Sequence, residues 1–198
     1  MKKLTAALLG VALIAAPAAP AIAGWKLIEQ GETVKVAKGP MAATANAEWN
    51  KWSVRPIKQG EIWTLDGTAL NELYFVTDLA AGQTLYRDSQ KKEAPLPTFA
   101  SSMELTDIPE FVESSTRLAL NTSVFEMINV EPSQLGGYPA VRFTYEYSVE
   151  GSALARKGLG VGTIVGGKLH LVTYAAPETY FYDRDLPKVE AIISSVSF

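Results

Sequence analysis

A single histidine, His170, restricts the catalytic chemistry open to this chain of 198 residues. A serine–histidine–aspartate relay would have to use it, but the sequence contains no Gly-x-Ser-x-Gly elbow to present a nucleophilic serine. Because cysteine is absent, thiolate chemistry is excluded, and a zinc site would need three carboxylate or water ligands beside this histidine. His170 also falls within a run of strand-forming residues, which favours a hydrogen-bonded structural role. We therefore predict no catalytic residue and no metal site.

Three glycines at alternate positions, Gly158, Gly160 and Gly162, resemble a nucleotide-binding loop only superficially. The third glycine of a dinucleotide fingerprint would fall at Thr163, and a strand pattern follows where a helix should begin. In a strand the three glycines share one face, so a helix or an aromatic ring can approach the backbone closely. The spacing favours this packing role over a ligand site, and we predict no cofactor.

The acidic residues near the C-terminus do not form a calcium site. Asp183 and Asp185 are one residue apart and Glu178 is near, but a calcium loop needs more oxygen donors and a glycine at its sharp turn. Asp185 is better explained as a helix cap. A hydrolase that uses two carboxylates alone leaves little trace in a sequence, so this function stays open as an alternative.

Aromatic residues are the best candidates for a binding site. Tyr180, Phe181 and Tyr182 are adjacent, and three successive side chains cannot all point inward. Tyr174 ends a predicted strand six residues before Tyr180, and Pro177 turns the chain between them. Both groups can therefore lie at one end of a sheet. We predict that these four aromatic residues edge a surface groove for a protein or a small apolar ligand.

Two charged residues complete this candidate site. Arg142 and Glu146 lie on the strand face opposite Val141 and Phe143, where they could add polar contacts to the groove or form a cross-strand pair. The alternative for the tyrosines is that they pack beneath the last helix of the chain.

The elements that position these residues are an antiparallel sheet and two helices. The segment Tyr138–Val149 alternates apolar and polar side chains, and 158–165 and 168–174 follow as strands joined by a Gly-Gly turn. These three strands predict the centre of a sheet. Shorter strands are expected in the first half of the chain, at 33–37, 41–47, 61–65 and 70–79.

Two helices are predicted from their capping residues and apolar stripes. The first covers 107–121, with Asp107 as its cap and Pro109 in its first turn. The second is expected to begin at Asp185, with Pro187 early in the helix. Their stripes are typical of core faces.

The segment 80–99 is predicted as a loop, because it contains Gly82, Pro95 and Pro97. Its charged run at 87–93 is typical of a solvated loop, and the alternative is a basic patch that binds a partner.

The first 23 residues are typical of a secretory signal peptide. Lys2 and Lys3 precede a short apolar run, and small residues lead to the expected cleavage after Ala23. We expect no stable membrane anchor after cleavage. Residues 24–198 would then form a single α+β domain, periplasmic or secreted from a bacterium, and held together without disulfides.

The charge of the chain gives no reason to expect nucleic acid as a partner. The formal net charge is −3, and removal of the two N-terminal lysines leaves 16 basic and 21 acidic residues, a net charge of −5.

The order of these elements resembles the PsbP-like domains, a family of extrinsic photosystem proteins and their bacterial secreted or lipoprotein relatives. The similarity lies mainly in 105–198: Gly-Gly-Tyr-Pro-Ala-Val-Arg-Phe at 136–143, Lys-Leu-His-Leu-Val-Thr-Tyr at 168–174, and a last helix that leads into Ser-Ser-Val-Ser-Phe. The cysteine of the lipoprotein members is absent. The resemblance implies an α-β-α sandwich that acts as an exported, non-catalytic accessory or binding domain, and it transfers no catalytic or metal-binding residue.

Overall fold

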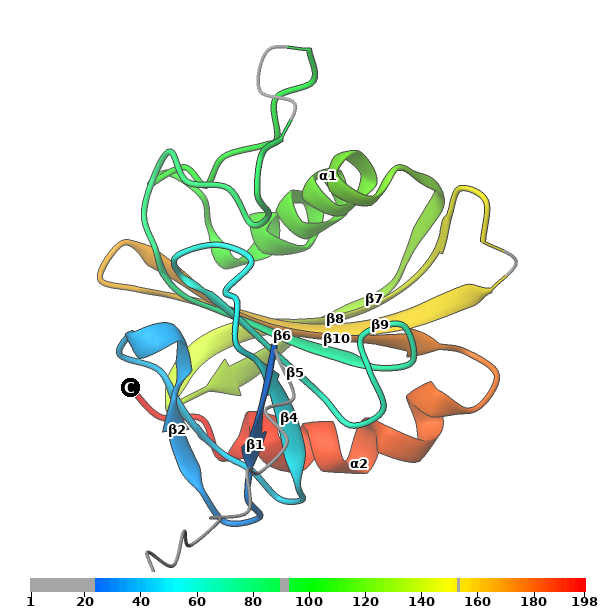
Figure 1. The fold of residues 1–198 in the computed structure, drawn as a ribbon. Helices are drawn as coiled ribbons and strands as arrows, with labels where there is room; N and C mark the ends of the chain where they lie inside the picture. The colour runs from blue at the N-terminus through cyan, green and yellow to red at the C-terminus, as the bar shows by residue number, and fades with distance from the viewer. Residues whose placement is uncertain (1–23, 90–92, 153) are drawn as a thin grey trace, which may run out of the picture.

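An antiparallel sheet of eight strands organises the part of the chain that the computed structural model describes, residues 24–89, 93–152 and 154–198 (Figure 1). The strand order is β1-β4-β5-β6-β10-β9-β8-β7. The strands are β1 Trp25–Ile28, β4 Trp49–Trp52, β5 Gly60–Thr64, β6 Glu72–Leu79, β7 Thr122–Leu135, β8 Tyr138–Val149, β9 Ala155–Val165 and β10 Lys168–Pro177. A separate hairpin pairs β2 (Thr33–Lys35) with β3 (Ala42–Thr44).

Two α-helices pack against this sheet, α1 (Ile108–Leu120) and α2 (Phe181–Ser194), and Figure 1 shows one on each side of it. Short 3₁₀ helices cover Val36–Lys38 (η1) and Leu105–Asp107 (η2). The α+β class with an antiparallel sheet and two principal helices, predicted from the sequence, is therefore confirmed. The first helix is also confirmed, with Pro109 in its first turn and Asn121 in the left-handed conformation at its end. The predicted cap is not: the Asp107 side chain makes no hydrogen bond to α1 and instead accepts one of 2.8 Å from the Glu104 amide.

Each helix belongs to a different cluster of buried apolar side chains. Ile108, Phe111 and Val112 of α1 pack with one face of the sheet, which includes Phe143 and Leu171. The stripe of α2 packs with the other face; its buried members are Val189, Ile192 and Ile193. The period-two pattern of β8 explains this division, because alternate side chains of one strand supply opposite faces.

The glycines of β9 allow rings of β8 to lie against the backbone, as the sequence predicts. A Cβ atom at Gly158 would overlap the Tyr145 ring, and one at Gly160 would overlap the Phe143 ring. At Gly162 the close neighbour is Ile108 of α1. The packing interpretation of this glycine track is confirmed.

His170 has the structural role predicted for it. It lies in β10 with its side chain buried, and its Nδ1 accepts a hydrogen bond of 3.2 Å from the backbone N–H of Asp78. The C-terminal Phe198 covers the imidazole edge-on, with ring centroids 4.7 Å apart.

Strand β7 is absent from the sequence-based prediction. It pairs with β8 along almost its whole length, but a register shift between Met127 and Asn129 breaks its alternation of side chains. Pro132 further obscures the strand pattern. The strands β1 and β4, each four residues long, are also missing from the prediction.

The start of the second helix was predicted four residues too late. It begins at Phe181, so Asp185 is an interior residue and does not cap it. The Asp185 carboxylate is fully buried, and it binds the side chains of Arg184 and Lys188 of α2. A contact outside the helix explains the error, because Asn71 donates a 3.2 Å hydrogen bond to Asp185 across 114 positions of sequence.

The described residues of 80–99 form no helix or strand, in agreement with the predicted loop. The predicted signal peptide at 1–23 lies outside the described residues.

Candidate functional site

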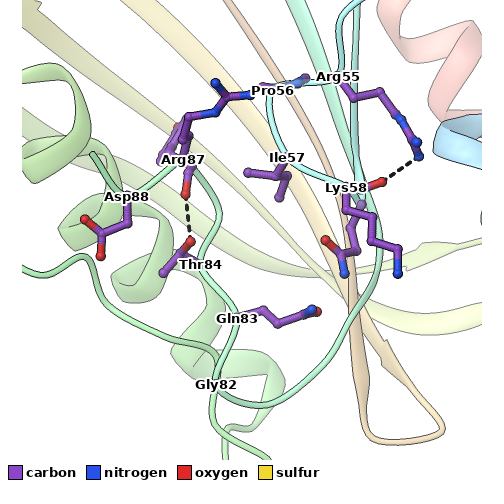
Figure 2. Close-up of a pocket in the computed structure, with 11 residues that line it drawn as sticks. Arg55, Pro56, Ile57, Lys58, Gly82, Gln83, Thr84, Arg87 and Asp88 are labelled. Carbon is purple, nitrogen blue, oxygen red and sulfur yellow. Dashed lines mark hydrogen bonds between the residues drawn. The ribbon is translucent and has the colours of Figure 1, made fainter. Parts of the chain in front are cut away.

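A cavity of about 700 Å³ opens between two loops, residues 55–59 and 82–88 (Figure 2). The first loop joins β4 to β5, and the second follows β6. Figure 2 shows Ile57 in the middle of this site, with Lys58 on one side of it and Arg87 on the other. The volume falls within the range of roughly 300–1,000 Å³ that is common for small-molecule sites in proteins.

Hydrogen bonds hold the first wall of the cavity. The guanidinium Nη1 of Arg55 donates to the carbonyl oxygens of Ala37 and Lys58, at 2.9 and 2.8 Å. The carbonyl of Gln59 accepts a 3.0 Å bond from the Thr77 amide. Arg55 therefore ties this loop to η1, while Gln59 ties it to β6.

The second wall is held in a similar way. The Gly82 amide donates to the Phe99 carbonyl, and the Phe99 amide donates to the Gln83 carbonyl, both at 2.8 Å. The Gln83 side-chain oxygen accepts a 2.8 Å bond from the Ala80 amide. Both walls are thus fixed before any ligand arrives, which lowers the entropy cost of binding.

Tyr86 forms an aromatic part of the lining. Its ring stacks on Tyr74 with centroids 5.9 Å apart, and its hydroxyl lies 3.1 Å from that of Thr116 on α1. Burial raises the pKa of the Tyr86 phenol, so the group stays neutral.

The ionic side chains of the lining are mainly cationic. The lining contains three cationic side chains, Arg55, Lys58 and Arg87, and one carboxylate, Asp88. Asp88 accepts a hydrogen bond from the Leu96 amide, 3.4 Å away. The cavity is therefore locally positive, although the whole chain has a formal net charge of −3.

The six site residues that the sequence predicts do not line one surface groove in the structure. Tyr174 is fully buried on β10; its hydroxyl donates to the Phe181 carbonyl at 3.0 Å, and its ring stacks on Tyr182. It therefore does not edge a surface groove, which corrects that expectation. The physical reason is that Tyr174 points to the face covered by α2, so it forms part of that core.

The neighbouring aromatic residues have different surroundings. Tyr180 is 59% exposed, and Tyr182 is buried. Phe181 is partly buried, and the Arg184 guanidinium lies over the rings of both Phe181 and Tyr180, at 4.9 and 5.4 Å from their centroids. One of the three adjacent aromatics thus faces solvent, as their spacing requires.

The two charged residues are also separated. Arg142 forms ion pairs with Glu190 of α2 and, at 3.5 Å, with its cross-strand neighbour Glu131. Glu146 instead lines a small groove of about 240 Å³ together with Tyr182. The structure brings only these two of the six residues together in one concavity.

The loop cavity was missed by the sequence analysis. Its walls come from two irregular segments with no periodic pattern, and Arg87 belongs to a run that is typical of solvated loops. The available signal was the mixture of amide, aromatic and basic side chains at 83–87, next to a glycine.

The fold is similar to those of several solved structures. The structure of cyanobacterial PsbP (CyanoP) from Synechocystis sp. PCC 6803 matches with a TM-score of 0.52 and 14% identity, over 92% of this chain and 97% of that one. The fold is PsbP-like. The resemblance predicted mainly for 105–198 thus extends over most of the chain.

Weaker matches include LpqN, involved in cell envelope biogenesis of Mycobacterium tuberculosis, with a TM-score of 0.39, 10% identity, and coverage of 90% of this chain and 80% of that one. The Saccharomyces cerevisiae Ran-binding protein Mog1p matches with a TM-score of 0.46, 8% identity, and coverage of 87% and 94%. No protein-family model and no curated protein matches the sequence.

The described residues of this PsbP-like chain lack two features. They contain no group of three or more His, Cys, Asp or Glu side chains placed to hold a metal ion. None of the helices in the described part of the chain has the length and apolar character needed to cross a membrane.

Proposed function

We propose that this chain is an exported, non-catalytic accessory domain that binds a small ligand between loops 55–59 and 82–88. The observation that carries the proposal is the 700 Å³ cavity whose two walls are fixed by backbone hydrogen bonds. A preformed concave site with both apolar and polar lining suits recognition of a small molecule.

The lining favours binding over hydrolysis. A carboxylate-only hydrolase needs two carboxyl groups that flank the bond to be cleaved, whereas the described lining of this cavity has only Asp88. The single histidine lies elsewhere, buried in β10. These placements support a non-catalytic function.

Export and the finer architecture belong to the same proposal. The pattern of the first 23 residues supports a periplasmic or secreted location. The packing of α1 and α2 with separate core clusters supports an α-β-α sandwich. N-terminal sequencing of the protein from its source cell tests export, because the mature chain should start at Gly24; an intact Met1 would contradict it.

The cavity function is tested by a binding screen. A library of small anionic, neutral and cationic metabolites is applied to the purified protein, and hits are mapped by NMR chemical-shift changes. We expect the changed amides to cluster at 55–59 and 82–88. A library without hits, or hits that map only to other surfaces, would contradict the proposed site.

A second candidate function is contact with a basic segment of a partner protein, on the sheet face beside α2. The specific observation is that Glu126 of β7 lies directly opposite Glu146 of β8, and neither forms an ion pair among the described residues, because Lys157 of β9, the neighbour of Glu146 on its other side, pairs with Glu178 instead. Like charges in this position are unfavourable, and a cation would relieve them. Val124 and Ile128, 56% and 53% exposed, leave apolar surface beside the two acids.

This contact is tested with a designed peptide of alternating lysine and leucine. We expect it to shift the amides of β7 and β8, and to bind less tightly to the Glu146→Lys variant than to the natural protein. Glu48→Lys carries the same charge change at an exposed position outside the sheet and is the control for charge. If both variants lose the same affinity for the peptide, the effect is one of overall charge, and the proposed contact at Glu146 is contradicted.

A further inference from the structure

We infer that the ligand of the loop cavity is an organic anion, whose phosphate or carboxylate charge is balanced by Lys58 and Arg87 on opposite walls. This inference rests on the function proposed above and names the chemical class of its ligand. It follows from the charge, the free donors and the apolar floor of the site.

The local charge has the opposite sign to the charge of the whole chain. A protein with a formal net charge of −3 repels anions on average, so an anion site needs a local excess of cations. The lining supplies three cations against one carboxylate, and Asp88 also accepts the Leu96 amide. A concave site lined by one sign of charge concentrates counter-ions.

The two cations assigned to the ligand are available to it. Lys58 and Arg87 are exposed, and neither forms an ion pair with any residue that the structure describes. Arg55 is different, because one of its guanidinium nitrogens is already bonded to two carbonyl oxygens. Arg55 therefore positions the loop and adds charge, while Lys58 and Arg87 remain free to contact an anion.

The uncharged polar lining also favours an acceptor-rich ligand. Gln83 already uses its side-chain oxygen to accept the Ala80 amide, so its NH₂ group is the part left for a ligand. Together with the ammonium of Lys58 and the guanidinium of Arg87, it gives the lining three side-chain groups that donate hydrogen bonds. Phosphate and carboxylate oxygens accept hydrogen bonds and are the natural complement.

An apolar floor separates the two cations and indicates that the ligand has an organic body. Ile57 lies between Lys58 and Arg87 in Figure 2, and Pro56 and Tyr86 also line the cavity. A free inorganic anion would contact the cations but leave this surface bare. A ligand with a carbon skeleton can cover the floor while its anionic group reaches a cation.

The test uses four probes that share one body and differ in charge: glucose 6-phosphate, glucuronate, glucose and glucosamine. Inorganic phosphate is the fifth probe and lacks the body. Binding to the purified protein is measured by NMR titration of the amides at 55–59 and 82–88. We expect the two sugar anions to bind at least about tenfold more tightly than glucose, and glucosamine to bind least. The two anions also distinguish phosphate from carboxylate recognition.

Single substitutions assign the effect to the two side chains. Lys58→Ala and Arg87→Ala should each weaken binding of the sugar anions by roughly three- to fivefold, and should leave glucose binding unchanged. Lys26→Ala removes an exposed lysine of β1 outside the cavity and should change neither. Binding of the anions should also weaken as salt is added.

The outcomes separate this inference from the function on which it rests. Equal affinity for glucose and its anionic relatives, or equal effects of Lys26→Ala and Lys58→Ala, would overturn the anion assignment but keep the cavity as a ligand site. If inorganic phosphate binds as tightly as glucose 6-phosphate, the organic body is overturned. If no probe shifts these loops, the anion assignment is overturned, and only the broader library screen then decides the proposed function.

Discussion

The hydroxyl of Tyr174 donates a 3.0 Å hydrogen bond to the carbonyl oxygen of Phe181, which is the first residue of α2. This bond joins the buried central strand β10 to the helix that covers it. Of the residues predicted to edge one groove, Tyr174 is therefore part of the core and Tyr180 is not. Substitutions at these two positions should have different effects on stability.

Tyr174→Phe should destabilise the protein by about 1–2 kcal/mol, because the partly buried carbonyl of Phe181 loses this donor. Tyr180→Phe makes the same chemical change at a 59% exposed ring and should cost less than about 0.5 kcal/mol. Urea denaturation of both variants measures the free energies of unfolding. Equal losses of unfolding free energy in the two variants would show that the Tyr174 hydrogen bond does not stabilise the protein.

Gly160→Ala should destabilise the protein by about 1–3 kcal/mol, since the added Cβ overlaps the ring of Phe143. The double variant Gly160→Ala with Phe143→Leu should lose less stability than the sum of the two single changes, because the smaller side chain frees the space. Thermal and urea unfolding of the four proteins provides the test. Strict additivity would contradict direct contact between these positions.

Stability should fall as the pH is lowered from about 6.5 to about 4 through protonation of His170 in the unfolded chain. Burial lowers the pKa of His170 from 6.5 to about 4 in the folded protein, while Asp78 opposes and Lys168 assists the shift. Between these values the unfolded state binds a proton that the folded state does not, so the loss is complete only below the folded pKa. After allowance for solvent screening, we expect roughly 2–3 kcal/mol.

The variant His170→Gln isolates this contribution from that of the carboxylates. Its stability should depend less on pH between 4 and 6.5 than that of the natural protein, whatever its absolute value. Denaturant unfolding at a series of pH values measures the two slopes. Identical slopes would contradict a buried, neutral His170.

Asp185→Ala should cost about 2–3 kcal/mol, because Lys188 and Asn71 lose the buried carboxylate that they bind, while Arg184 keeps its ion pair with Asp66. Loss of a helix cap would cost only about 1 kcal/mol. Asp183→Ala, at an exposed position in the first turn of α2, is the matched control and should change stability by less than about 1 kcal/mol. A small effect at Asp185 would contradict a stabilising role for its buried ion pairs.

Patterns confined to one short segment were the ones that could be predicted. The apolar stripe of α1, the alternation in β8 and the glycine spacing in β9 each follow from the geometry of a single element. Strand β7 escaped detection because its bulge changes the face on which successive side chains lie.

The functional site depends on contacts between distant parts of the chain, which single-segment patterns do not reveal. From the sequence, Asp185 resembles a helix cap and Tyr174 resembles a groove residue. In the structure Asp185 contacts the distant Asn71, and Tyr174 contacts α2, which covers it. The cavity needs Lys58 and Arg87 on facing loops, and no local pattern in the sequence brings those loops together.

The glycine track of β9 has a consequence for the evolution of this fold. Each glycine and the ring that covers it share one fixed volume, so Gly160 with Phe143 and Gly158 with Tyr145 form pairs of complementary size. A larger residue at one position is acceptable only after the ring opposite has become smaller. Among homologous chains, we therefore expect the two residues of each pair to change together: where the β9 residue is larger than glycine, the β8 residue opposite should be smaller than an aromatic ring.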